Sequence, residues 1–291
     1  MAVVTVEEAT RGKARVRFTE LPNVLHGEDP HWAPPVLAWE RYRLDAHRNP
    51  YFDRAEVALF LARRAGRPAG RIAAHLPSAD GGATGTEGRF GFWAVADDRE
   101  VAVALVEAAG DWLDEQGCTS MTGPWSFEPE DEPGALAGGH DTAGTTGRPW
   151  RPSWEVDLLD QLAFEVVGES ATWRLRTSEV GPDAPTGRER PGQAGPYSDP
   201  RLVLERISAV PDLSGALRDP RLRAAWGLAK QARLADWEGC TVVRCTGRPE
   251  VEVPALVAAA GRAGYAWVVA PWSPDPGAPP ETVHRTYRLT W

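Results

Sequence analysis

The chain has 291 residues, of which 42% are hydrophobic and 25% charged, close to ordinary globular usage. Its 29 glycines and 26 prolines make up about 19% of the residues, below the roughly 25–30% that marks low-complexity chains. Composition therefore excludes whole-chain disorder and fibrous repeats. The net charge of −9 argues against nucleic-acid binding, which needs clustered cations.

The cysteine content and the hydropathy pattern indicate the cellular compartment. Cys118, Cys240 and Cys245 are too few for a disulfide framework and lack the spacing of a zinc or redox pair. No apolar run approaches the roughly 18 residues of a membrane span, and Glu7 and Glu8 stand where a signal peptide needs an apolar core. We therefore expect a cytoplasmic monomer or homodimer with no metal, membrane or nucleic-acid partner.

The first half of the chain alternates strand and helix patterns. An opening strand (4–9) precedes a helix over 13–26 that we expect to break near Pro22, because proline cannot donate the helical hydrogen bond. Two apolar runs around the turn 65–68 predict a β-hairpin over 55–77. Further elements are predicted in this order: strand 88–97, helix 99–117, strand 119–127, a Gly-rich excursion 128–150, helix 153–163 and strand 164–176.

The second half begins with a stretch that has no periodic apolar face. Residues 177–200 are rich in proline, glycine and charge, and we interpret them as a linker. Strand and helix patterns then alternate to the end of the chain, with a long helix over 213–235. The predicted domains are 1–176 and a smaller α/β part, 201–291, and both are mixed α/β.

Several motifs carry a resemblance to a known superfamily. They are FTELPNVLHGEDPHWAPP, NPYF, FLARRAGRPAGRIAAH, GRFGFW, the helix ending DWLDEQG, the pair Gly123-Pro124, and DEPGALAGGHD, and they span about residues 18–175. Together they resemble the GNAT superfamily of acyl-CoA N-acyltransferases, and more specifically a bacterial GNAT-like family of largely uncharacterised proteins. The resemblance implies a central mixed sheet flanked by helices, with 201–291 as a candidate partial second GNAT-like unit.

The resemblance also implies a cofactor, acetyl-CoA or another acyl-CoA. It would lie where the fourth strand and the strand after the next helix splay apart, and its diphosphate would meet the start of that helix. The implied cofactor-binding residues are Trp93, Val95, Ala96, Arg99, Val101 and Ala102. The loop departs from the family pattern, because Ala102 and Ala104 replace glycines and Asp97, Asp98 and Glu100 would repel phosphates.

Catalytic candidates follow Gly123-Pro124. The tyrosine that protonates the leaving thiolate in many GNAT enzymes corresponds to Leu159, which cannot donate a proton. An acidic loop could instead supply a general base from Glu128, Glu130 or Asp131, with His140 as a further base. Four residues could hold a cationic amine: Trp125, Glu132, Trp150 and Trp154. The same residues also suit a solvated acidic loop anchored by packed tryptophans.

Two classes of function follow from these residues. The first is an acyltransferase that moves an acyl group from acyl-CoA to a small-molecule amine. The alternative is a repurposed GNAT-like protein that binds a small molecule or protein partner, or a biosynthetic tailoring enzyme that does not use CoA. The missing glycines and the missing tyrosine motivate this alternative.

Overall fold

The computed structural model describes residues 3–32, 37–78, 86–127, 132, 134–142, 149–176, 203–207, 242–246, 267–270 and 277–291. The chain divides into two compact units. Residues 1–169 and 284–291 form the first, and residues 170–283 form the second.

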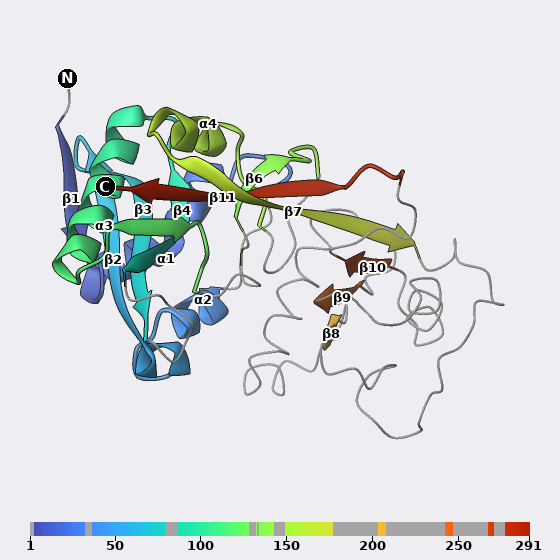
Figure 1. The fold of residues 1–291 in the computed structure, drawn as a ribbon, viewed down its shortest axis with the longest axis horizontal. Coiled ribbons are helices and arrows are strands. Elements are labelled where there is room, and N and C mark those ends of the chain that lie inside the picture. The colour runs from blue at the N-terminus through green and yellow to red at the C-terminus, as the bar shows by residue number, and fades with distance from the viewer. Residues whose placement is uncertain are drawn as a thin grey trace. The chain divides into compact units, whose positions relative to one another are not determined.

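The first unit is built on a mixed sheet (Figure 1). Its strands follow the order β1-β2-β3-β4-β5-β11, and a short strand β6 also pairs with β11. Along this order all neighbours are antiparallel except β4 and β5, which run parallel. The bounds are β1 Val4–Glu8, β2 Ala55–Arg64, β3 Arg67–Pro77, β4 Glu87–Val95, β5 Ser120–Gly123, β6 Ala135–Gly138 and β11 Thr282–Thr290.

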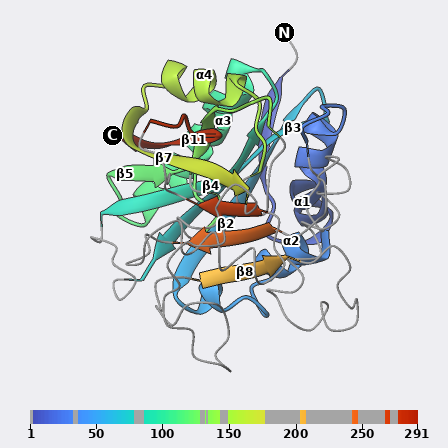
Figure 2. The same cartoon turned by 90° about the vertical axis from the view of Figure 1, so that its right-hand side faces the viewer.

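Two helices cover opposite faces of this sheet (Figure 2). Helix α1 (Gly12–His26) lies on one face, and α3 (Arg99–Glu115) lies on the other. Helix α4 (Trp154–Gln161) adds its buried Val156, Leu158 and Leu159 to the α3 side. Helix α2 (Leu37–Arg43) and the 3₁₀ turn η1 (Pro50–Asp53) connect α1 to the hairpin.

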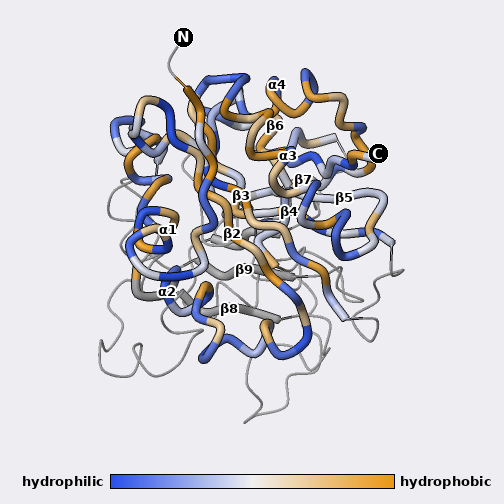
Figure 3. The backbone as a smooth tube through the Cα atoms, turned by 90° about the vertical axis from the view of Figure 1, so that its left-hand side faces the viewer, coloured by the Kyte–Doolittle hydropathy of each residue, from blue (hydrophilic) through white to orange (hydrophobic). Residues whose placement is uncertain are grey.

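The period of the strands explains why there are two cores. Alternate residues of a strand face opposite sides of the sheet, so Ile72 packs beneath α3 while its neighbour Ala73 packs beneath α1. The α1 side is closed by Phe18, Leu59 and Phe92, all buried. Helix α1 is amphipathic, and its hydrophilic and hydrophobic stretches alternate along the tube in Figure 3.

Three expectations about elements were wrong. Helix α1 runs unbroken through Pro22, which is buried together with Phe18 and Leu21, so packing against the sheet outweighs the missing hydrogen bond. The strand expected over 119–127 ends at Gly123, because proline at 124 has no amide hydrogen to continue the ladder. The Gly-rich excursion contains strand β6, whose Ala135 and Leu136 are buried.

The second unit contains a smaller mixed sheet of four strands among its described residues. Its order is β7-β10-β9-β8, with β9 and β10 parallel and the other two pairs antiparallel. The bounds are β7 Glu165–Arg176, which begins in the first unit, β8 Val203–Ile207, β9 Val242–Thr246 and β10 Trp267–Ala270. The predicted linker 177–200 and helix 213–235 lie outside the described residues, so the domain boundaries stay a prediction. Strand β11, although late in the chain, completes the sheet of the first unit.

Candidate functional site

Strands β4 and β5 pair at one end and separate at the other. Their parallel ladder joins Glu87–Arg89 to Ser120–Thr122 and goes no further. Beyond it the chain turns at Pro124, and the Trp125 amide donates to the Phe90 carbonyl at 2.7 Å. The approach is so close that a Cβ on Gly91 would lie 1.6 Å from the Trp125 carbonyl oxygen. The parallel ladder therefore ends at Arg89 and Thr122, while the segment after Pro124 stays in close contact with β4.

A buried histidine holds the segment after Pro124 in place. His75 Nε2 lies 3.2 Å from the Trp125 carbonyl oxygen, which can only accept, so Nε2 carries the proton. Its Nδ1 then accepts from the Tyr51 hydroxyl at 2.6 Å. Burial lowers the pKa of His75 to about 3, so the ring stays neutral under ordinary conditions.

A β-bulge shapes the open end of β4. Arg71 pairs with Ala94, and Ala73 pairs with Gly91, so β4 holds one residue more than β3 across this interval. Phe92 takes up the extra length with a φ of 49°. Phe92 consequently packs on the α1 side and Trp93 on the α3 side of the sheet.

Helix α4 covers the backbone edge at the end of β4. The Val95 amide donates to Glu155 Oε1 at 3.1 Å, and the Val95 carbonyl accepts from Trp154 Nε1 at 2.9 Å. The neighbouring Ala96 amide donates to the Ala69 carbonyl at 2.9 Å. The backbone groups that the GNAT resemblance offers to a pantetheine arm are therefore bonded within the chain.

A small pocket lies beyond the end of the β4–β5 ladder, beside Pro124. Its enclosed part has room for about one water-sized group. Its wall joins β4, the start of β6 and the start of α4, and consists of Trp93, Pro124, Glu132, Gly134, Ala135, Arg151 and Glu155. Three of these residues carry charged side chains that are largely buried, which makes the pocket polar.

Glu132 is the centre of a buried ion-pair network. Its carboxylate lies 3.2 Å from Arg43 Nη1 and 3.2 Å from Arg151 Nη2, and it accepts a hydrogen bond from the Ser126 hydroxyl. Arg43 also pairs with the buried Glu40 at 2.8 Å. Burial alone would raise the pKa of Glu132, but Arg43 and Arg151 lower it to about 2. Glu132 is therefore a fixed anion and a poor general base.

Trp150 and Trp154, together with Trp32 from the segment after α1, surround a histidine. The ring of His26 lies 5.2 Å from that of Trp32, 5.9 Å from that of Trp150 and 6.4 Å from that of Trp154. His26 Nε2 is also 3.7 Å from Glu155 Oε1. Two of the three tryptophans considered for an amine, Trp150 and Trp154, therefore pack against a side chain of the protein itself.

The start of α3 is filled by an acid. The Asp98 carboxylate caps the amides of Glu100 and Val101 at 3.1 and 3.3 Å. Arg64 grips the same carboxylate at 2.8 Å through both Nε and Nη2, and it also pairs with Glu100. Partial burial raises the pKa of Asp98, but its bonds to Arg64 and to the Val101 amide lower it overall.

The predicted site residues fall into separate places. Trp93 and Glu132 line the pocket, and Trp154 and Val95 bond to each other beside it. Arg99 is exposed at the start of α3, whereas Val101 and Ala102 are buried in the core beneath that helix. Glu128, Glu130 and Asp131 lie outside the described residues, so their roles stay predictions.

The remaining predicted residues anchor the surrounding segments. His140 Nδ1 lies 3.0 Å from the Arg151 carbonyl, and the His140 carbonyl accepts from Trp150 Nε1 at 2.7 Å. The Trp125 ring lies beneath the Arg89 guanidinium, 5.4 Å from centroid to Cζ. None of His140, Trp125 and Trp150 is among the residues that line the described pocket.

Sequence reasoning missed the basic side of the site. Arg43 and Arg151 hold Glu132, and a third buried arginine, Arg71, donates to the Phe18 carbonyl at 2.8 Å. Burial lowers the pKa of Arg71 to about 10. In a chain whose cations are nearly all arginine, nothing in the local sequence distinguishes these three from exposed ones.

Comparison with known proteins gives two partial sequence relatives, and no protein-family profile matches. The chain is 41% identical to "Bacterial ceramide synthase" of Caulobacter vibrioides over 128 residues, 43% of this chain and 33% of that protein. It is 30% identical to "Protein YghO" of Escherichia coli over 164 residues, 56% of this chain and 42% of that protein. The chain thus spans less than half the length of either relative.

A solved structure identifies the fold class. The tandem GNAT protein from the clavulanic acid biosynthesis pathway, solved without AcCoA, matches with a TM-score of 0.52 at 11% identity. The match covers 99% of this chain and 98% of that chain. The chain therefore has the GNAT fold, and the predicted mixed α/β class is confirmed. No helix among the described residues is long and apolar enough to cross a membrane.

The residues that the GNAT resemblance assigns to acyl-CoA do not fit its diphosphate. Asp98 already occupies the first amides of α3, and Arg64 balances its charge. Glu155 and Trp154 occupy the Val95 backbone. A second anion at α3 would have to displace the Asp98 carboxylate and would face Glu100.

Replacing Asp98 tests whether its carboxylate caps α3. Asp98→Ala should lower the free energy of unfolding by about 1 kcal/mol, because two amides of α3 lose their acceptor. Asp98→Asn keeps a capping oxygen and should cost less. Urea unfolding of the two variants measures the difference, and equal losses would contradict the capping role.

Proposed function

We propose that this chain is an acyltransferase of the GNAT fold. It transfers an acyl group to an amine and does not bind a nucleotide diphosphate at α3. The observation that carries the proposal is the polar pocket beyond the end of the β4–β5 ladder, in a chain of this fold. The donor would be an acyl thioester. Because the Asp98 carboxylate already binds the first amides of α3, we expect the donor to be recognised through its acyl end and thioester arm.

The name of one relative supports the class of acceptor. A ceramide is the amide of a long-chain amino alcohol, and the protein named bacterial ceramide synthase shares 41% identity with this chain over 128 residues. We take a long-chain amino alcohol as the first acceptor to test, with a short primary amine as its comparison.

The reaction needs a proton acceptor near the attacking nitrogen. The amine nitrogen bonds to the thioester carbonyl carbon, the carbon–sulfur bond breaks, and the nitrogen loses a proton while the thiolate gains one. Of the two carboxylates that line the pocket, Glu132 is held by two arginines. Glu155 bonds to the Val95 amide and makes no arginine pair among the described residues, so we assign it the proton acceptor role, shared with the predicted acids of the loop.

The test is amide formation, measured by mass spectrometry, with two acetyl donors. Acetyl-CoA and S-acetyl-pantetheine share the thioester arm and differ in the nucleotide. Because α3 is sealed by Asp98, we expect the two donors to react at rates within about three-fold of each other. A preference for acetyl-CoA of ten-fold or more would overturn the donor assignment.

Variants test the role of Glu155. Glu155→Gln keeps an oxygen for the Val95 amide but cannot take a proton, and it should lower the rate by about 10²-fold or more. The matched control is Glu107→Gln on the exposed face of α3, which should leave the rate unchanged. Equal rates for the two variants would remove Glu155 from the mechanism.

A second candidate function is a binding protein that has kept the fold and lost acyl transfer. The observation that favours it is the use of both backbone groups of Val95 by α4. If no amide forms with either donor and either acceptor while a carbonyl compound still binds, this candidate is supported and the acyltransferase is rejected.

A further inference from the structure

Two hydrogen-bond donors at the pocket have no acceptor among the described residues. Trp93 is 2% exposed and Arg151 is 6% exposed. The Trp93 Nε1–H lacks a partner. Arg151 donates through Nη2 to Glu132, and its Nη1 has no hydrogen-bond acceptor among the described residues. A buried donor without an acceptor is unfavourable, so two such donors at one pocket point to a ligand group that supplies the acceptor.

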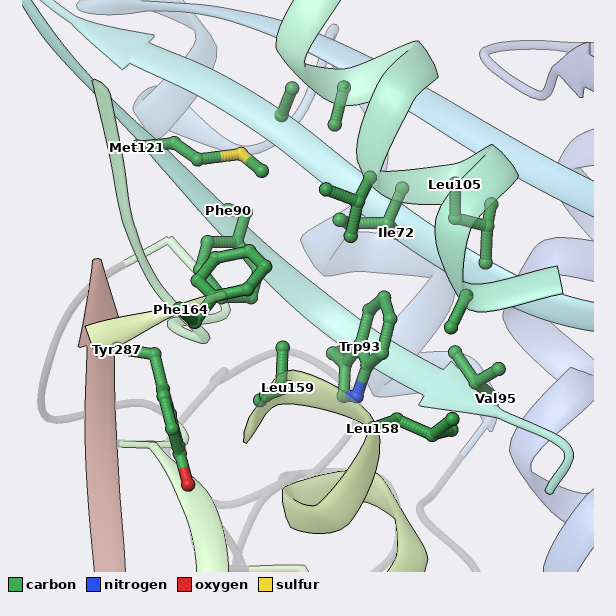
Figure 4. Close-up of a cluster of buried hydrophobic side chains, with 14 of the residues drawn as sticks. Ile72, Phe90, Trp93, Val95, Leu105, Met121, Leu158, Leu159, Phe164 and Tyr287 are labelled. Atoms are coloured by element: carbon green, nitrogen blue, oxygen red, sulfur yellow. The ribbon is translucent and has the colours of Figure 1, made fainter. Parts of the chain in front are cut away.

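The two donors reach the pocket from separate elements. Trp93 comes from the bulged end of β4, and Arg151 comes from the segment just before α4. Figure 4 shows Trp93 between β4 and α4, beside Leu158 and Leu159, with its nitrogen at the end nearer α4. Apolar neighbours surround the rest of the indole, which leaves the nitrogen as its polar contact.

The pocket also limits what the acceptor can be. Its interior has room for about one water-sized group. The carboxylates of Glu132 and Glu155 line the same wall and disfavour a ligand that itself carries a full negative charge. A neutral carbonyl oxygen has the right size, accepts two hydrogen bonds and carries no charge.

From these contacts we infer that Trp93 Nε1–H and Arg151 Nη1–H bind one carbonyl oxygen, the acyl oxygen of the thioester. This inference rests on the proposed function and names its substrate-binding donors. When the amine adds to the carbonyl carbon, negative charge develops on this oxygen, and the Arg151 cation and the Trp93 dipole stabilise it. The two side chains would thus donate to the acyl oxygen, which the Val95 amide cannot do because it already donates to Glu155.

The test uses nuclear magnetic resonance of the indole N–H groups in the full chain. The probe is S-acetyl-N-acetylcysteamine, a thioester without a nucleotide, and its matched control is the thioether S-ethyl-N-acetylcysteamine, which lacks the thioester carbonyl. Trp93→Phe identifies the Trp93 signal among the 13 tryptophans by its absence. We expect the thioester to shift that signal downfield and the thioether to leave it in place.

Variants give a second measurement. Trp93→Phe keeps an aromatic ring but no donor, and Arg151→Lys keeps the charge that faces Glu132 but loses the guanidinium fork. Each should weaken thioester binding about ten-fold and slow amide formation about 10²-fold. The matched control is Trp112→Phe, on α3 and outside the pocket lining, which should change neither.

The outcomes separate this inference from the proposed function. If amide forms while the Trp93 signal stays in place and Trp93→Phe reacts like the parent, the carbonyl site is wrong and the acyltransferase stands. If the signal moves with the thioester alone but no amide forms, the carbonyl site stands and the acyltransferase is wrong. A signal that moves equally with the thioether overturns the carbonyl site.

Discussion

Gly91→Ala is expected to lower the free energy of unfolding by about 3 kcal/mol or more. An alanine Cβ would lie 1.6 Å from the carbonyl oxygen and 2.3 Å from the carbonyl carbon of Trp125, and both are backbone atoms. The segment after Pro124 would have to move away. The move would break the Trp125–Phe90 backbone bond and the His75 bond to the Trp125 carbonyl.

The matched control for this change is Gly110→Ala in the middle of α3. A Cβ there meets nothing within 4 Å, and alanine is the better helix former, so stability should rise by about 0.5–1 kcal/mol. Urea unfolding of both variants gives the comparison. A Gly91→Ala midpoint equal to that of the parent would show that β4 and the Pro124 segment are not in close contact.

The fold could be predicted because it depends on local patterns. The hairpin of β2 and β3 follows from two apolar runs and the turn at Ala65 and Gly66, both of which adopt positive φ. Helix α3 follows from its apolar spacing and from Asp98, which caps it as an acid in that position commonly does. The helix through Pro22 could not be predicted, because the packing that holds it comes from the sheet.

The site was harder to predict, because its contacts join residues that are far apart in the chain. Arg43 and Glu132 are 89 positions apart, and Val95 and Glu155 are 60 positions apart. The family pattern drew attention to the acidic loop, but it does not show which acid is neutralised. Glu132 was interpreted as a site for a cation, and the structure gives it two arginines of its own.

Two carboxylates of the chain occupy the places that the GNAT resemblance reserves for a cofactor. Asp98 occupies the start of α3, and Glu155 occupies the Val95 amide. The two positions are close in the chain, on either side of Ala96. A chain that had merely lost its glycines would leave these amides open, whereas here each amide donates to an acidic side chain of the protein. The departures in the loop sequence therefore act together, and they favour a donor without a nucleotide.

Glu132→Gln is expected to lower the free energy of unfolding by about 3–5 kcal/mol at neutral pH, because Arg43 and Arg151 would remain buried with their shared anion removed. The matched control is Glu20→Gln, which breaks an exposed pair with Arg41 and should cost less than about 1 kcal/mol. Urea unfolding at pH 7 separates the two. Equal losses would mean that the network does not stabilise the fold.

The pH dependence gives Glu132 a second and independent test. Its pKa is about 2 in the folded chain against an ordinary value of 4.5, so the unfolded chain binds more protons between these two pH values. The stability that Glu132 contributes is complete above pH 4.5 and is lost as the pH falls toward 2. His75, with a folded pKa of about 3 against 6.5, adds a loss that begins at higher pH. The free energy of unfolding, measured from pH 7 to 2, should therefore fall less steeply below pH 4.5 in Glu132→Gln than in the parent. The contribution of His75 to the slope persists in both proteins. Identical slopes below pH 4.5 would mean that Glu132 titrates normally.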